Sequence, residues 1–182
     1  VGSTATAADG RAVLEAYRLA VPASITRWLR EPGAETPKPD DPRLDHATYR
    51  MIATPALSLQ AAAQACEVAG YRPVMLGDRI EGEAREVAKV LAAIAISCAE
   101  HGTPAQPPCV VLSGGETSVT VRSDGRGGRN VEFLLGLAIA LEGRPGITAL
   151  AGDTDGIDGS EDNAGALADE TTLARARALG LN

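Results

Sequence analysis

Residues 81–112 decide the fold class, and they read EGEAREVAKVLAAIAISCAEHGTPAQPPCVVL. Over residues 81–100 the apolar side chains recur with the period of an α-helix, and Gly102 is a typical residue to end it. Residues 109–112 are all apolar, which is typical of a strand that is covered on both faces of a sheet. A long helix that leads into such a strand indicates a right-handed crossover unit of a parallel sheet.

The same alternation of helices and strands continues on both sides of this unit. Thr54 and Pro55 supply an N-cap and a preset first turn for a helix. The expected helices cover 56–69, 81–100, 130–141 and a segment from near Thr171, and the expected strands cover 49–53, 72–76, 109–112, 119–121 and 147–151. The pattern predicts an α/β fold with a mostly parallel sheet flanked by helices, in a Rossmann-like three-layer arrangement.

The chain also shows a candidate domain boundary. Residues 31–42 are rich in proline, which removes backbone donors and therefore argues against a helix or a central strand. We expect residues 1–44 to be the end of a preceding domain plus a linker, and residues 45–182 to be the α/β domain. Because the chain starts at Val1 without a signal pattern and stops at Asn182 without a helix cap, we expect a piece of a longer protein.

Composition excludes several classes of partner. The 182 residues carry 17 basic and 24 acidic side chains, a net charge of −7, which argues against nucleic acid as the main partner. No apolar run approaches the roughly 20 residues that span a bilayer. The three cysteines lack metal-type spacing, and each lies in an apolar pattern. They predict buried, reduced thiols and a cytoplasmic location.

The first polar segment that follows a strand is Ser113–Thr117. Gly114 and Gly115 allow the backbone to approach an anion, while Ser113, Glu116 and Thr117 add polar side chains. The alternative is a tight turn between strands. The segment is not a Walker A loop, because no Gly-Lys-Ser/Thr follows it.

The second segment, residues 122–130, leads into a helix. Arg126, Gly127, Gly128, Arg129 and Asn130 combine guanidinium groups with a helix N-terminus, which together favour binding of a phosphate or a carboxylate. Asn130 is the expected N-cap of that helix. A solvated loop is the alternative. The spacing is also an incomplete dinucleotide fingerprint, and this keeps a nicotinamide enzyme open.

The third segment, residues 152–163, carries five carboxylates within ten residues. Its spacing does not fit a calcium-binding loop, but Mg²⁺ needs only one or two carboxylates plus substrate phosphates. We assign Asp155 and Asp158 as candidate metal ligands. Asp153, at the expected end of a strand, is the candidate base, with Arg129 as the second catalytic candidate. A solvated acidic turn is the alternative.

The three segments resemble the glycerate 2-kinase family, whose C-terminal portion is the MOFRL domain and which is also known as hydroxypyruvate reductase. The residues that carry the resemblance are Leu112–Val121, then Gly125–Asn130 with Glu132 and Phe133, and then Asp153–Gly159. Residues 36–39 and 81–86 also resemble that family.

The resemblance implies a two-domain enzyme more than twice this length, with the active site in a cleft between the domains. ATP and a divalent cation, Mg²⁺ or another, would phosphorylate the 2-hydroxyl of D-glycerate. Residues 1–44 would be the tail of the N-terminal Rossmann-like domain, which this chain otherwise lacks, so the chain alone should be inactive. An NAD(P)H-dependent hydroxypyruvate reductase and a non-catalytic ligand-binding module stay open as alternatives, and the sequence does not decide whether the enzyme is a homo-oligomer.

Overall fold

A computed structural model describes residues 2–122, 124–160 and 162–181. It divides into two compact units, residues 1–52 and residues 53–182. The proline-rich segment expected to act as a linker lies within the first unit. That residues 1–44 come from a preceding domain stays a prediction.

The first unit contains two short helices, α1 (Ala7–Ala16) and α2 (Ala23–Trp28), neither of which has a buried residue. The proline-rich segment forms two single 3₁₀ turns, Pro32–Ala34 and Pro42–Leu44. Proline fits the first position of such a turn because its missing N–H is not needed there. The sequence prediction that this segment forms neither an α-helix nor a strand is confirmed.

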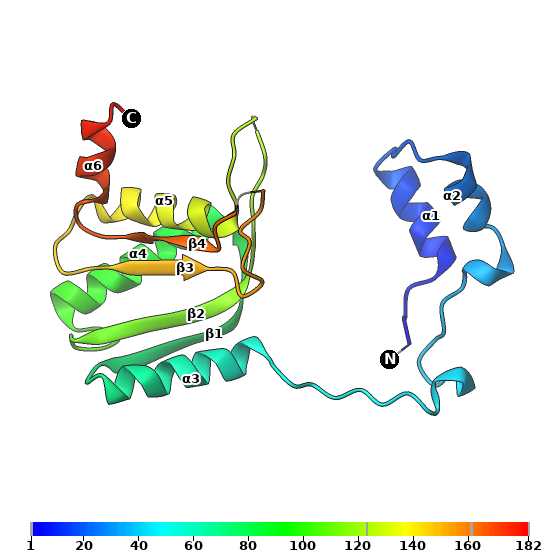
Figure 1. Ribbon diagram of the computed structural model, residues 1–182, viewed down its shortest axis with the longest axis horizontal. Coiled ribbons are helices and arrows are strands. Elements are labelled where there is room, and N and C mark those ends of the chain that lie inside the picture. The colour runs from blue at the N-terminus through cyan, green and yellow to red at the C-terminus, as the bar shows by residue number, and fades with distance from the viewer. Residues whose placement is uncertain (1, 123, 161, 182) are drawn as a thin grey trace. The chain divides into compact units, whose positions relative to one another are not determined.

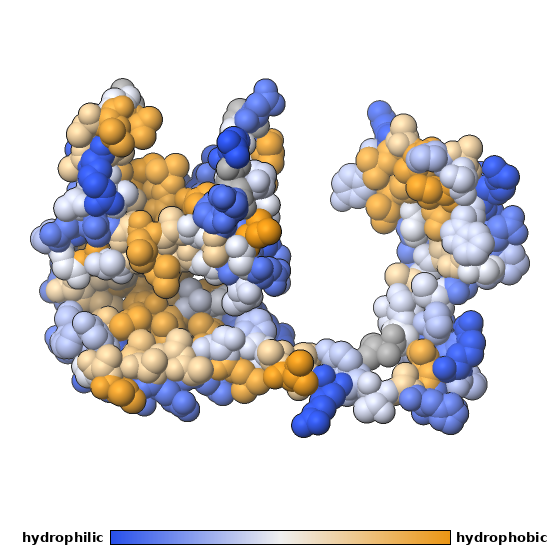
Figure 2. All heavy atoms as spheres, viewed as in Figure 1, coloured by the Kyte–Doolittle hydropathy of each residue, from blue (hydrophilic) through white to orange (hydrophobic). Residues whose placement is uncertain are grey.

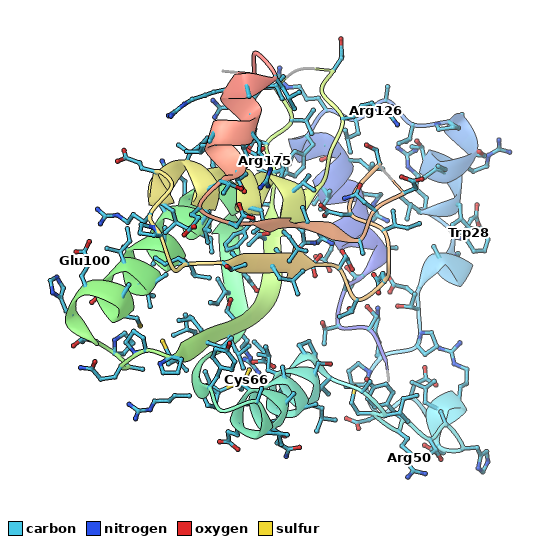
Figure 3. All side chains as sticks on the ribbon, turned by 60° about the vertical axis from the view of Figure 1, so that its left-hand side comes forward. Trp28, Arg50, Cys66, Glu100, Arg126 and Arg175 are labelled. Carbon is cyan, nitrogen blue, oxygen red and sulfur yellow. The ribbon has the colours of Figure 1, made fainter. Side chains whose placement is uncertain are left out.

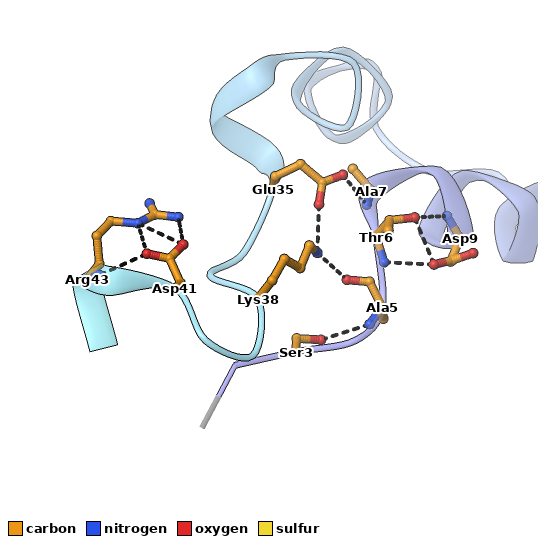
Figure 4. A network of polar contacts seen from close by, with 9 residues as sticks. All are labelled: Ser3, Ala5, Thr6, Ala7, Asp9, Glu35, Lys38, Asp41 and Arg43. Carbon is orange, nitrogen blue, oxygen red and sulfur yellow. Dashed lines mark hydrogen bonds and ion pairs between the residues drawn. The ribbon is translucent and has the colours of Figure 1, made fainter. Parts of the chain in front are cut away.

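Polar contacts join the proline-rich segment to the start of α1 (Figure 4). Glu35 accepts a hydrogen bond from the Ala7 amide at 2.8 Å, and the Lys38 ammonium lies 2.8 Å from the same carboxylate. Lys38 also donates to the carbonyl oxygen of Ala5 at 2.6 Å. Hydrogen bonds from Arg43 lower the pKa of Asp41 to about 2. The contacts of Glu35 and Lys38 connect this segment to α1, in a unit where none of residues 2–52 is buried.

The second unit is built on a parallel pair of strands, β1 (Arg72–Glu83) and β2 (Cys109–Ser118). Helix α4 (Ala84–His101) connects them, and α3 (Pro55–Val68) precedes β1. Both helices pack against the pair, one on either side of it (Figure 1). Thr54 caps α3 by accepting the Leu57 amide at 3.2 Å. The predicted α/β fold, with a parallel sheet flanked by helices, is confirmed.

Both strands are longer than the sequence suggested, and this corrects the prediction for residues 113–117. Ser113 pairs with Gly77 and Glu116 with Glu81, so the segment expected to be a loop is a continuation of β2. The register shifts twice between Met75 and Ile80, which marks a bulge where the apolar run of β1 ends. The strands expected at 119–121 and 49–53 do not form.

Gly115 is required by the close approach of these two strands. Its φ is +152°, and a Cβ there would lie 2.0 Å from the carbonyl oxygen of Ile80. We expect Gly115→Ala to lower the free energy of unfolding by about 3 kcal/mol, the upper end of typical overpacking costs, in urea denaturation.

The neighbouring glycine provides the control. A Cβ on Gly114 would meet the Leu59 side chain at 3.5 Å, an ordinary contact, so Gly114→Ala should change the unfolding free energy by less than about 1 kcal/mol. Equal effects of the two substitutions would show that the strand contact is not what requires Gly115.

The rest of the unit contains α5 (Arg129–Leu141), β3 (Ala149–Gly152), β4 (Gly165–Ala168) and α6 (Thr172–Ala178). Strand β4 was not predicted, and it pairs antiparallel with β3. A four-residue strand of glycine, alanine and leucine has too little β-propensity to be recognised from its sequence.

The core is made of small and aliphatic side chains, with α5 at its centre. Leu134 and Ala138 of α5 pack against Ala168 and the alanines of β3 and β4, while Leu137 and Leu141 pack against α4. On the opposite face of the β3–β4 pair, Leu150 and Leu167 are register partners and are 74% and 69% exposed. Figure 2 shows apolar side chains gathered over these strands.

Two other sequence predictions can be compared with the structure. All three cysteines are free thiols, with Cys98 buried and the other two half-buried. Burial raises the pKa of the Cys109 thiol. Within the described ranges, no helix is both long and apolar enough to cross a bilayer.

Candidate functional site

The three polar segments meet at one end of the second unit. Strand β2 ends there at Ser118, β3 ends there at Gly152, and α5 begins there at Arg129 (Figure 1). Ligands in α/β folds bind at the carboxyl ends of the strands, so this end is where a site is expected.

Arg129 joins all three segments through its guanidinium. One terminal nitrogen, Nη1, contacts the Glu116 carboxylate of β2, and the other, Nη2, donates to Oδ2 of Asp153 at 3.1 Å. Exposure of the side chains falls from 76% at Glu116 to 36% at Arg129 and 12% at Asp153. The arrangement is a planar cation that lies between an exposed carboxylate and a nearly buried one. Such a cation can bind a phosphate or carboxylate through two parallel hydrogen bonds.

Asp158, from the acidic loop, caps α5 from a distant part of the chain. Its Oδ1 accepts the Asn130 amide at 3.0 Å and the Asn130 side-chain nitrogen at 3.1 Å, and its Oδ2 accepts the Val131 amide at 2.9 Å. Asp158 is fully buried. The N-cap residue itself is Gly128, which has no side chain to offer.

This arrangement corrects the expectation that Asn130 is the N-cap. Asn130 is the second residue of α5, and its side chain is a donor to Asp158 rather than an acceptor for the helix. Residue 158 lies 28 positions away in sequence, so no local capping pattern could have revealed the true cap.

The glycines of the second segment make room for the acidic loop. A Cβ on Gly128 would lie 2.3 Å from the carbonyl oxygen of Asp158, and one on Gly159, whose φ is +73°, would lie 2.4 Å from that of Gly127. The Ser160 amide also donates to the Gly127 carbonyl at 3.4 Å. The two backbones are therefore in direct contact, and phosphate binding by Gly127 and Gly128 stays a prediction.

Backbone hydrogen bonds close the acidic loop over the β3–β4 hairpin. The Asp153 amide donates to Ala164 at 2.6 Å, and the Asp158 amide donates to Asn163 at 2.7 Å. Asp155 is exposed, and its amide donates to Oδ1 of Asp153 at 2.9 Å. Asp153 and Asp158 therefore have fixed positions, while the side chain of Asp155 faces solvent.

The assignment of Asp155 and Asp158 as metal ligands stays a prediction, and the two carboxylates differ in how accessible they are. Among the described residues, no cluster of three or more His, Cys, Asp or Glu side chains is arranged to hold a metal ion. The carboxylate of Asp158 is engaged by α5, whereas that of Asp155 is exposed.

Glu83 belongs to the same end of the unit and was missed by sequence reasoning. It accepts hydrogen bonds from the Thr120 amide at 3.0 Å and from the Thr120 hydroxyl at 2.9 Å, and the amide in particular lowers the pKa of its carboxyl. The segment after β2 is thus held at its start, while Arg126, further along it, is exposed (Figure 3). A glutamate at a strand end carries no sequence signal for this contact.

Ser113, Gly114 and Thr117 lie in β2 rather than in a loop, within three positions of Glu116. Ser113 and Thr117 have partly buried side chains, and the structure places neither of them in a hydrogen bond with Arg129 or Asp153. Their assignment as phosphate- or substrate-binding residues stays a prediction.

The chain is similar over nearly its whole length to several known proteins. The chain is 47% identical over 184 residues to a protein of Agrobacterium vitis named "Putative hydroxypyruvate reductase", covering 100% of this chain and 41% of that protein. It is 34% identical to the glycerate 2-kinase of Pyrococcus horikoshii, covering 96% of this chain and 40% of that enzyme. The crystal structure of a glycerate kinase from Thermotoga maritima superposes with a TM-score of 0.74 at 31% identity, covering 99% of this chain and 42% of that one.

The chain thus spans about two fifths of the length of these relatives. The model of the MOFRL family matches residues 109–182, which hold β2, α5, the β3–β4 hairpin and all three polar segments. Residues 109–182 are therefore similar to the MOFRL family.

Proposed function

We propose that this chain is part of a glycerate 2-kinase, which transfers the γ-phosphoryl group of ATP to the 2-hydroxyl of D-glycerate. The observation that carries the proposal is the contact of Arg129 with both Glu116 and Asp153, because it unites the three segments around one anion-binding group. The glycerate kinases of Pyrococcus horikoshii and Thermotoga maritima, similar over nearly the whole chain, support it.

In this proposal Arg129 binds the transferred phosphate or the glycerate carboxylate, with Arg126 as a second cation. Phosphoryl transfer depends mainly on positioning and charge stabilisation, and a guanidinium held on two carboxylates supplies both. Asp153 orients or deprotonates the substrate hydroxyl. Its low exposure and its contact with Arg129 keep this carboxylate in one place.

A divalent cation would be held by Asp155 together with the phosphates of ATP. One or two carboxylates are enough for Mg²⁺ when phosphates supply the other ligands, and Asp155 has an exposed carboxylate at this end of the unit. When bound, the cation neutralises charge on the phosphates. Asp158 fits this role less well, because its oxygens already accept three hydrogen bonds.

The alternative function, hydroxypyruvate reductase, is suggested by the name of the Agrobacterium vitis relative. A dinucleotide fingerprint follows a strand directly and opens a helix. Here β2 ends at Ser118 and α5 begins only at Arg129. Gly128, moreover, lies against the backbone of Asp158. These observations favour the kinase.

The proposal includes an N-terminal domain that completes the active site, as the length of the relatives suggests. It also includes a cytoplasmic location, with which the three free thiols agree. A homo-oligomer stays open.

The test compares two reactions of the full-length protein. We expect phosphorylation of D-glycerate with Mg²⁺ and ATP, measured by coupled ADP release, and no oxidation of NADH or NADPH with hydroxypyruvate. Turnover in the second mixture alone would overturn the proposal in favour of the reductase. Turnover in neither would favour a non-catalytic module.

A further inference from the structure

We propose that Asp158 is a positioning residue: its carboxylate fixes the first turn of α5 and thereby holds Arg129 in place for catalysis. The inference rests on the proposed function only for its kinetic consequence. The acidic loop therefore contains carboxylates with separate tasks, although its composition suggests a single metal site.

Asp158 is a buried carboxylate that is hydrogen-bonded to the first turn of α5. Its side chain is fully buried, and the nearby guanidinium of Arg129 pairs with Glu116 and Asp153 instead. Burying an uncompensated carboxylate is costly. Here the compensation comes from the positive end of the helix, through the amides of Asn130 and Val131 and the side-chain nitrogen of Asn130.

Arg129 begins the helix turn that Asp158 caps. Arg129 is the first residue of α5, immediately before the two amides that Asp158 binds. Its guanidinium has to stay within hydrogen-bond distance of Asp153, which lies on the same loop as Asp158. Because one loop holds both the start of the helix and the carboxylate partner of its first side chain, the loop sets the distance between Arg129 and Asp153.

Gly128 and the acidic loop also fit each other sterically. Gly128 is so close to residue 158 that a Cβ would lie 2.4 Å from the carboxyl carbon of Asp158. The cap therefore depends on two residues: Asp158 supplies the buried carboxylate, and Gly128 leaves space for it. Neither feature is needed for a surface loop whose carboxylates bind only a cation.

The experiment compares Asp158→Ala with Leu141→Ala in the full-length protein. Leu141 is buried at the opposite end of α5, so its loss should destabilise the helix without moving the first turn. Below the melting temperature of both variants, we expect Asp158→Ala to lower kcat/KM at least tenfold and Leu141→Ala to leave it within twofold. The magnesium concentration for half-maximal rate should not change.

A double substitution separates positioning from an independent role. If Asp158 acts through Arg129, then adding Asp158→Ala to Arg129→Ala should lower kcat/KM by less than a further twofold. Multiplicative losses, or a raised magnesium requirement in the single variant, would overturn the proposal. If Asp158→Ala does not fold, Asp158→Asn replaces it in the experiment. Asparagine has nearly the same shape as aspartate but one acceptor oxygen fewer, so this variant should give the same pattern with a smaller loss of kcat/KM.

Amide hydrogen exchange tests the cap without using activity. In Asp158→Ala, or in Asp158→Asn, the amides of Asn130 and Val131 should exchange at least tenfold faster, while that of Leu137 in the middle of α5 stays protected. A crystal structure of the variant should show the Arg129–Asp153 ion pair broken. Unchanged exchange or an intact ion pair would overturn the inference. Absence of glycerate phosphorylation by the wild-type protein would instead overturn the proposed function. The exchange measurement and the crystal structure would still decide whether Asp158 positions Arg129.

Discussion

Replacing Arg129 with alanine is expected to lower kcat/KM for glycerate phosphorylation by about 10²–10³-fold in the full-length protein, the usual cost of removing a group that stabilises charge in the transition state. Arg129 is the cation that connects Glu116 of β2 with Asp153 after β3. Without this guanidinium the site loses its anion-binding group, and the carboxylates of Glu116 and Asp153 lose the cation that lies between them. Steady-state kinetics with D-glycerate and Mg-ATP measures the loss.

Two further variants show whether the geometry or the charge of Arg129 matters. Arg129→Lys keeps the charge but cannot make two parallel hydrogen bonds, so it should remain at least tenfold impaired. Arg175→Ala removes a different arginine, which lies on α6 (Figure 3) and is paired with Asp169, and it should leave the kinetics unchanged. If Arg129→Ala kept kcat/KM within twofold of the wild type, the assignment would fail.

Replacing Asp153 with asparagine is expected to lower kcat by about 10²–10⁴-fold, the range that general-base catalysis contributes. The substitution keeps the size of the side chain but removes the charge that pairs with Arg129 and the basic oxygen that would accept the hydroxyl proton. The magnesium concentration for half-maximal rate should stay the same. This concentration is measured by titrating Mg²⁺ at saturating ATP and glycerate.

Asp155→Asn is the matched comparison within the same loop. If Asp155 is a cation ligand, this variant should need more magnesium for half-maximal rate and recover much of its kcat when Mg²⁺ is saturating. Melting temperatures of both variants serve as the stability control. If Asp153→Asn and Asp155→Asn only lowered the melting temperature and kept normal kinetics, the acidic loop would be structural.

Helices were predicted more accurately than strands, and the reason is physical. Helix α3 begins after Thr54 as expected, because its cap is a contact between residues three positions apart. Helix α4 begins at Ala84 instead of residue 81, since β1 extends through Glu83. Strand ends depend on which neighbour is available for pairing, and neither the second half of β1 nor that of β2 has an apolar pattern that would show it.

The sequence predicted which segments form the candidate site but not which of their side chains contact each other. The sequence placed Arg129 at the start of a helix and Asp153 at the end of a strand, and the structure brings their side chains to 3.1 Å. The involvement of Glu116 required β2 to continue past Leu112, which the sequence did not indicate.

By itself, the sequence determined the α/β class, the helices of the second unit and the three polar segments, because caps, periodicity and glycine content are local properties. Only the tertiary structure decided that residues 113–117 form a strand, that β4 pairs with β3, and that Asp158 caps α5. Each of these depends on a pairing between residues 13 to 36 positions apart. Such pairings are stabilised by burial and by backbone hydrogen bonds that exist only once the chain has folded.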